Sequence, residues 1–287
     1  MAVRIRAIQT GITKIKTAQR SRKLGGLLRI FTDTQWTEWL PIYAWLIDHP
    51  EGIIIVDTGE TARTSEPGYF PSWHPYYRMA LQMNVKPEDE IGVQLEHIGI
   101  QQKDVKKLVL THFHTDHAGG LAHFPSSQIL VSGADYALAR SVSGKLLGYL
   151  PSRWPRWFTP TPIHFQHGQF GPFKQYFNVT QAGDVIVVPT PGHTPNHVSV
   201  IVKSEDVIYF LAGDTSYTQE HILDRIPDGV SPNAAITLGT IDRILNLARS
   251  QPLVYLPSHD PENVKRLEET RTLVAPATKQ VKEAVHA

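Results

Sequence analysis

The stretch KKLVLTHFHTDHAGG, residues 106–120, joins an apolar run to a dense group of side chains that bind metals. Its first part, KKLVLTH, predicts a buried strand. Along an extended backbone His112 and His114 point to the same side, and Asp116 continues that alternation. His117 points elsewhere unless the chain turns, and the small residues of HAGG allow a turn into a helix. The segment can therefore offer one pair of ligands to one metal ion and a second pair to another.

Composition narrows what such a site could hold. The 287 residues include no cysteine, so thiolate ligands, a cysteine nucleophile and disulfide bonds are excluded. Histidine and carboxylate remain as ligands, and these suit Zn²⁺ or ions of Fe, Mn and Co. The chain carries 28 basic and 27 acidic residues, with a formal net charge of +1. This balance gives no electrostatic reason to expect nucleic acid or an anionic membrane as a partner.

The N-terminal stretch MAVRIRAIQTG, residues 1–11, alternates apolar and polar residues and predicts a first strand. It lacks the apolar segment of a secretory signal peptide. No apolar run approaches the roughly 20 residues needed to span a bilayer, so we expect no integral membrane segment. We therefore expect a cytoplasmic protein.

Apolar runs rich in β-branched residues alternate with helical patterns along the chain. The runs predict strands at residues 40–47, 52–59, 106–112, 127–133, 184–190, 197–204, 207–214 and 252–259. Helical patterns occupy residues 88–99, 133–150 and 233–250, and another begins near Glu262. The first two runs predict a hairpin with DHPEG as its turn. We expect one domain, residues 1–287, with a mixed sheet or pair of sheets and helices outside.

The cluster at residues 112–117 supplies too few ligands for two metal ions, so others should lie at further strand ends. His193 follows one run in PTPGHT, Asp214 ends VIYFLAGD, and His259 ends PLVYLPSH. A single histidine at a strand end is usually structural or solvated. Because strand ends gather at one edge of a sheet, these residues together with the cluster predict a binuclear metal site.

The order of short motifs along the chain resembles that of the metallo-β-lactamase superfamily. The motifs are VDTG (56–59), THFHTDHAGG (111–120), TPGHT (190–194), AGD (212–214) and SH (258–259). The HxHxDH part is specific to that superfamily, and the shorter motifs gain weight in series. The resemblance implies an αββα sandwich, in which two mixed sheets lie between outer helices.

The resemblance also implies a ligand set. It assigns three histidines to the first metal, namely His112, His114 and His193. It assigns Asp116, His117 and His259 to the second. Asp214 and a hydroxide would bridge the two ions, which are most often zinc, and Asp57 would orient a ligand histidine.

The stretch GDTSYT, residues 213–218, resembles the N-acyl homoserine lactone lactonases, which are quorum-quenching enzymes. Residues 40–59 also resemble the N-terminal hairpin of that family. The resemblance implies that the bridging hydroxide attacks the lactone carbonyl, while Tyr217 and the first metal stabilise the oxyanion. Asp116 or Asp214 would carry a proton to the leaving alkoxide. A tyrosine that only packs beside the site is the alternative for Tyr217.

Irregular segments rich in aromatic residues, proline and glycine interrupt the regular pattern, above all at residues 11–39 and 151–181. Such long loops are usually functional or disordered, and their aromatic content argues against disorder. We expect a groove for an acyl chain from Trp36, Trp39, Phe70, Trp73, Trp154, Trp157 and Phe158. The alternative is a homodimer interface, where aromatic residues are also enriched.

Other proteins on the same scaffold remain alternatives. An organophosphate or aryl-ester hydrolase, or a thioesterase of the glyoxalase II kind, would use the same two metals, but the Ser-Tyr pair after Asp214 favours the lactonase. A diiron oxygen- or nitric-oxide-reducing protein would carry glutamate where the motif has Asp116. RNA processing is disfavoured by the neutral charge. A metal-dependent sensor would be expected to have a damaged ligand set, yet every expected position is filled.

Overall fold

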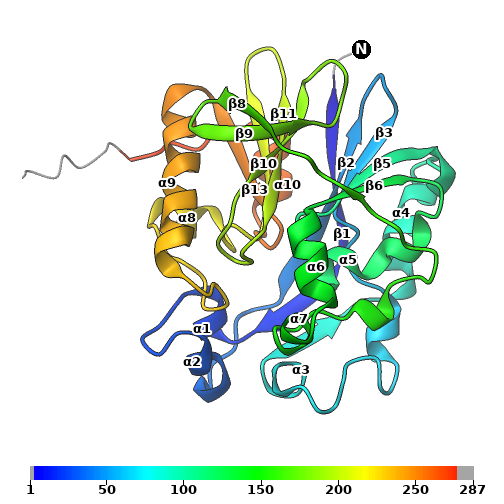
Figure 1. Ribbon diagram of the computed structural model, residues 1–287, viewed down its shortest axis with the longest axis vertical. Coiled ribbons are helices and arrows are strands. Elements are labelled where there is room, and N and C mark those ends of the chain that lie inside the picture. The colour runs from blue at the N-terminus through cyan, green and yellow to red at the C-terminus, as the bar shows by residue number, and fades with distance from the viewer. Residues whose placement is uncertain (1–2, 277–287) are drawn as a thin grey trace, which may run out of the picture.

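The computed structural model describes residues 3–276, and within them two mixed sheets pack face to face with helices on their outer faces (Figure 1). The first sheet has the order β4-β1-β2-β3-β5-β6-β7. Its strands are β1 (Arg4–Ile15), β2 (Leu40–Asp48), β3 (Ile53–Val56), β4 (Leu81–Asn84), β5 (Val105–Val109), β6 (Gln128–Val131) and β7 (Thr161–Pro162). The expected αββα sandwich is confirmed.

The second sheet has the order β13-β12-β11-β10-β9-β8. Its strands are β8 (Gln166–Phe170), β9 (Phe173–Asn178), β10 (Val185–Pro189), β11 (Val198–Lys203), β12 (Ile208–Gly213) and β13 (Leu253–Pro257). Strands β12 and β13 are parallel, and β10 and β12 are both antiparallel to β11. The chain therefore leaves β10, β12 and β13 at the same edge of this sheet.

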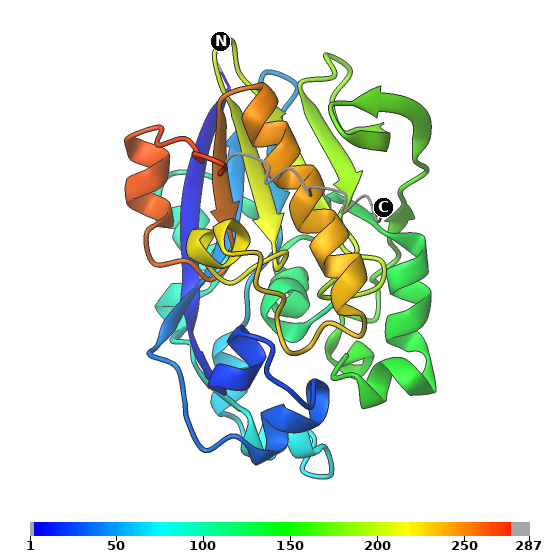
Figure 2. The same ribbon diagram turned by 90° about the vertical axis from the view of Figure 1, so that its left-hand side faces the viewer.

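Helices cover both outer faces and one end of the sandwich. They are α1 (Thr17–Arg20), α2 (Leu27–Thr32), α3 (Pro75–Met79), α4 (Ile91–His97), α5 (Thr115–Ala118), α6 (Gly133–Arg140), α7 (Val142–Leu146), α8 (Gln219–Leu223), α9 (Ala234–Ser250) and α10 (Asn263–Glu268). Figure 2 shows α9 lying across the second sheet, with α1 and α2 at the lower end of the molecule. No helix among residues 3–276 is long and apolar enough to cross a membrane.

The position of β2 within the first sheet explains why its sequence is apolar almost throughout. Tyr43, Trp45 and Ile47 pack between the sheets, against residues of the second sheet such as Val200. Ala44 and Leu46 belong instead to the cluster under α4 and α5. Because the strand is buried on both faces, alternation of apolar and polar residues is lost. A third cluster joins α9 to the second sheet.

The structure corrects two expected boundaries. The single helical pattern at 133–150 is split, because the Ser141 hydroxyl accepts from the backbone N–H of Gly144 and so begins α7. The helix expected after HAGG begins earlier, at Thr115, so Asp116 and His117 both lie in α5 rather than on extended backbone. The segments treated as irregular contain the end of β1, α1, α2 and strands β7 to β9.

Candidate metal centre and adjoining cavity

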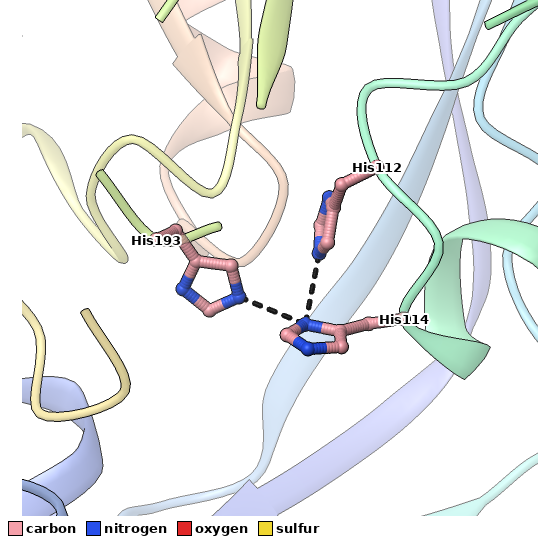
Figure 3. Close-up of side chains that lie close together, drawn as sticks. All are labelled: His112, His114 and His193. Atoms are coloured by element: carbon pink, nitrogen blue, oxygen red, sulfur yellow. Dashed lines mark hydrogen bonds between the residues drawn. The ribbon is translucent and has the colours of Figure 1, made fainter. Parts of the chain in front are cut away.

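Three histidines, from loops that follow strands of the two sheets, meet at one edge of the sandwich. His112 and His114 lie in the loop after β5, and His193 lies in the turn after β10. The Nδ1 atom of His114 is 3.0 Å from Nε2 of His112 and 3.0 Å from Nε2 of His193 (Figure 3). All three ring nitrogens lie within 4.8 Å of one another.

Hydrogen bonds fix which nitrogens of this trio carry protons. The Thr111 hydroxyl donates to the Asp57 carboxylate at 2.9 Å, so His112 must donate its Nδ1 proton to Thr111 Oγ1 at 3.1 Å. His193 donates from Nδ1 to Asp228 Oδ2 at 3.0 Å. The Nε2 atoms of His112 and His193 therefore both face His114 with lone pairs.

One proton on His114 cannot satisfy both of those lone pairs. A cation can, because a tetrahedral ion with ligands at about 2.0–2.1 Å separates neighbouring nitrogens by about 3.3 Å. The observed 3.0 Å separations are close to that edge length. This trio therefore fits a metal ion.

A second set of ligands lies beside the first and is formed by Asp116, His117 and His259. His117 donates from Nδ1 to Asp57 Oδ2 at 2.9 Å, and His259 donates from Nδ1 to the carbonyl of Pro41 at 2.8 Å. Their Nε2 atoms are left as acceptors. His259 Nε2 lies 3.4 Å from Asp116 Oδ2, while His117 Nε2 is buried without a hydrogen-bond partner.

The carboxylate of Asp214 spans the two sets. Its Oδ1 lies 3.3 Å from His117 Nε2 and 3.4 Å from His259 Nε2, while its Oδ2 lies 3.4 Å from His193 Nε2. Oδ1 is buried and has no hydrogen-bond partner. A buried acceptor facing buried imidazole lone pairs is costly unless a cation lies between them, so the geometry fits one ion on each side of Asp214.

Burial and neighbouring charges shift the pKa values of the candidate ligands in different directions. Burial lowers the pKa values of His112 and His114 well below the ordinary value, which favours the neutral form that binds metals. Burial also lowers the pKa of His193, but Asp228 and Asp214 outweigh it and raise that pKa. Burial raises the pKa of Asp214, yet the neighbouring histidines hold it well below its ordinary value. Metal binding would displace the protons that these groups otherwise share.

Two supporting groups, Asp228 and the Pro41 carbonyl, escaped the sequence analysis, whereas the position of His197 just after the ligand loop already indicated a supporting role. Asp228 is buried and orients His193, but it lies in the loop before α9, where no local pattern marks it. The Pro41 carbonyl orients His259 through the backbone, which sequence alone cannot reveal. His197 lies under the site, where its Nε2 accepts from the backbone N–H of Asp214 at 3.1 Å. Burial lowers the pKa of His197 to about 3, so it stays neutral.

A cavity opens over these ligands, and part of its wall is formed by His114, Asp116, His193, Asp214 and His259. Its apolar walls come from four places: β1 with Ile15, β4 with Leu81 and Met83, α2 with Leu27, Ile30 and Phe31, and α7 with Leu146 and the adjoining Leu147. Tyr217 lines it too, with its ring stacked on His259 at a centroid distance of 5.4 Å. The cavity therefore pairs polar ligands with an apolar passage.

The aromatic residues expected to form the groove lie elsewhere. None of them lines this cavity: Trp36, Trp39, Phe70, Trp73, Trp154, Trp157 and Phe158. We correct the groove assignment accordingly.

Each of these rings has another environment. Trp154 and Phe158 pack with Phe113 beneath the first sheet, where they help to cover the apolar outer face of that sheet beside α6. Phe70 stacks on Tyr77. The Nζ atom of Lys16 lies 3.8 Å from the ring centroid of Trp36. The others, Trp39, Trp73 and Trp157, are exposed, so a homodimer interface remains a hypothesis for them.

Comparison with known proteins identifies the family. The model of the metallo-β-lactamase superfamily matches residues 37–259. The chain belongs to this superfamily. An N-acyl homoserine lactonase of Bacillus thuringiensis is 28% identical over 237 residues, which covers 79% of this chain and 84% of that protein.

Solved structures share the fold. A mutant of AiiA from B. thuringiensis, with N-decanoyl-L-homoserine bound at its active site, has a TM-score of 0.76 and 24% identity, with 92% of this chain and 96% of that chain covered. AidC, a dizinc quorum-quenching lactonase in complex with its N-hexanoyl-L-homoserine product, has a TM-score of 0.65 and 14% identity, with coverage of 90% and 88%. At this identity the likeness establishes the fold.

Proposed function

We propose that this chain is a binuclear metal-dependent hydrolase that opens the lactone ring of N-acyl homoserine lactones, the quorum-quenching reaction. The observation that carries this proposal is the position of Tyr217. Its ring stacks on His259, a candidate ligand of the metal centre, and it lines an otherwise largely apolar cavity. The lactonases similar in sequence support the same substrate class.

The ligands would divide between two divalent cations, for which histidine and carboxylate donors suit zinc, with Fe, Mn or Co as alternatives. His112, His114 and His193 would hold one ion. Asp116, His117 and His259 would hold the other, with Asp214 shared. When bound, such a pair supplies a nucleophilic hydroxide at neutral pH and polarises the substrate carbonyl.

Tyr217 would donate its hydroxyl proton to the lactone carbonyl oxygen as negative charge develops there. Burial, followed by the nearby charge of Asp214, raises the pKa of Tyr217 well above its ordinary value, so the group stays a donor. The loss of one such donor typically costs roughly 2.7–4 kcal/mol of transition-state stabilisation. Asp116 or Asp214 would then carry a proton to the ring oxygen as it leaves.

The acyl tail would extend from the metal centre along the apolar cavity walls. Leu27 and Leu147 line the cavity and are 43% and 42% exposed, so they mark its mouth on two sides. Burial of a methylene group is worth about 0.8 kcal/mol. A longer acyl chain should therefore bind more tightly until it passes these two leucines.

Turnover with product identification tests the proposal. Purified protein should convert N-acyl homoserine lactones to N-acyl homoserines and should contain two metal ions per chain by elemental analysis. Full activity with one metal or fewer would contradict the binuclear site. A clear preference for phosphotriesters, aryl esters or thioesters over lactones would point instead to the other hydrolases of this scaffold.

Tyr217→Phe tests the assignment of the donor. This variant should keep both metals and the fold, because only one hydroxyl is removed. Its kcat/KM on acyl homoserine lactones should fall by roughly ten- to a thousand-fold, with a smaller loss on an activated aryl ester. Equal rates for the variant and the parent on every lactone would exclude the role. A larger loss on a phosphotriester than on lactones would favour the organophosphate hydrolase.

A further inference from the structure

Gln19 in α1 joins two tyrosines of the cavity wall. Its side-chain nitrogen lies 2.9 Å from the hydroxyl oxygen of Tyr76 and 3.0 Å from that of Tyr217. All three residues line the cavity, and Gln19 is 4% exposed. Tyr76 belongs to α3 and Tyr217 to the loop after β12, so the amide connects three segments that are distant in sequence.

The direction of these bonds determines what the tyrosines can do. An amide nitrogen only donates, so each tyrosine oxygen accepts and each keeps its own proton for another acceptor. In this orientation Gln19 uses both amide hydrogens and leaves one buried atom, Oε1, without a partner. The reversed amide would leave two hydrogens unpartnered instead. The observed orientation is the one that leaves both tyrosine protons available to a substrate, whereas the reversed amide would accept both of them.

We propose that Gln19 is a positioning residue that holds Tyr217 and Tyr76 as a matched pair of hydroxyl donors for the two carbonyl groups of an N-acyl amino lactone. Tyr217 would serve the lactone carbonyl, and Tyr76 the amide carbonyl. This inference rests on the proposed function and extends it from a lactone to a substrate that carries an acylamino group.

The spacing of the two donors agrees with this substrate. Each tyrosine oxygen lies within 3.0 Å of the same nitrogen, so the two oxygens are at most about 6 Å apart. In an N-acyl amino lactone the two carbonyl carbons are separated by three bonds, and their oxygens span a comparable distance. Burial also raises the pKa of Tyr76, so both hydroxyls remain protonated at neutral pH.

The backbone of Gln19 is held independently of its side chain. Its N–H donates to the Lys16 carbonyl at 2.9 Å, and its own carbonyl accepts from Gly229 at 2.8 Å. A substitution at this position can therefore remove the amide while α1 stays attached to the neighbouring loop. This separation makes a side-chain test of the proposal interpretable.

A double-mutant cycle tests whether Gln19 acts through Tyr217. Gln19→Leu should lower kcat on the accepted lactone by roughly ten- to a hundred-fold, within the range for a mispositioned donor. In the Tyr217→Phe background the same change should cost less than about three-fold, because the group it positions is gone. Additive losses would overturn the proposal. Gln169→Leu, at an exposed glutamine of β8, is the matched control and should leave activity unchanged.

Gln19→Glu separates positioning from packing. The carboxylate keeps the length of the side chain but accepts from both tyrosines, which turns their protons away from the substrate. The loss in kcat should then match or exceed that of Gln19→Leu, whereas a packing role predicts near-normal rates and would refute the inference. If the leucine variant fails to fold, the glutamate variant takes its place in the cycle.

A substrate without an acylamino group tests the second donor. Tyr76→Phe should raise KM for an N-acyl homoserine lactone by about ten-fold and change hydrolysis of a simple alkyl γ-lactone by less than about three-fold. Equal losses on both would overturn the assignment to the amide carbonyl. Wild-type protein that opens alkyl lactones but not acyl homoserine lactones would contradict the proposed function, while the cycle of Gln19 with Tyr217 could still be measured on the alkyl lactone.

Discussion

Asp57→Asn should weaken one metal position much more than the other. Both oxygens of Asp57 accept hydrogen bonds: Oδ1 from the Thr111 backbone N–H at 2.8 Å, and Oδ2 from His117 Nδ1 at 2.9 Å and the Thr111 hydroxyl at 2.9 Å. Asp57 has a φ of 61°, which asparagine tolerates, so the backbone need not move. The substitution therefore removes a charge and one acceptor from a fully buried site.

The magnitude follows from this bonding. An asparagine can direct its oxygen to only one set of donors, so its NH₂ group must face another N–H. A buried donor left in this way costs about 1–3 kcal/mol of folding stability. Loss of the partner that orients a ligand histidine typically lowers metal affinity by about 10–100-fold. Only His117 donates to Asp57 among the ligands, so the ion bound by Asp116, His117 and His259 should be affected.

Competition with a graded chelator, followed by elemental analysis, measures the effect. The variant should lose one ion per chain at a chelator concentration that leaves both in the parent, and the second ion should persist. Asp184→Asn is the matched control, since Asp184 accepts from His49 Nε2 at 3.0 Å away from the centre. The Asp184→Asn variant should retain both metals with parental affinity. Parental affinity for both metals in Asp57→Asn would refute the reasoning.

Other predictions test the remaining features. Asp214→Asn should loosen both ions, because each carboxylate oxygen faces a different ligand set; two retained metals with near-normal kcat would show that it does not bridge. Leu147→Gln should raise KM for long-chain substrates about three- to ten-fold and leave short-chain substrates unchanged, whereas an equal effect on both would exclude a tail contact. Burial raises the pKa of Glu60 to about 7 from 4.5, so the folded state disfavours the ionised form of this carboxyl. The parent should therefore keep its full free energy of unfolding below pH 4.5 and lose about 3 kcal/mol of it, relative to Glu60→Gln, as the pH rises through 7. Urea unfolding of both proteins across this pH range measures the difference, and an unchanged difference would contradict the prediction.

The convergence of the candidate ligands could be predicted because each one follows a strand with a clear apolar pattern. His193, Asp214 and His259 lie close to the ends of β10, β12 and β13, and parallel or matching strand directions place those ends together. Asp228 could not be found in this way, since its contact with His193 depends on how a loop packs. Residues at the ends of regular strands can thus be predicted from sequence, whereas residues in irregular loops that orient them cannot.

The cavity wall was the least predictable part. Aromatic content indicated that the irregular segments were ordered, but not what their rings would touch. Phe158 is buried beneath the first sheet and Trp154 is partly buried against the same cluster, where large rings gain from burial. The wall instead uses leucines of α2 and α7, whose segments carry no distinguishing motif. Which apolar residues face a cavity rather than the core depends on tertiary packing.

The separate placement of metal ligands and cavity walls has a consequence for how this protein could diverge. The candidate ligands are anchored by the edges of two sheets, while much of the wall, apart from β1 and β4, comes from α1, α2, α3 and α7, which are helices of four to six residues. A change in one of these short helices can reshape the passage without moving a ligand. The shape of the cavity can therefore change while the candidate ligands stay in place, and exchange of the segment between β1 and β2 is a direct route to a passage of different shape.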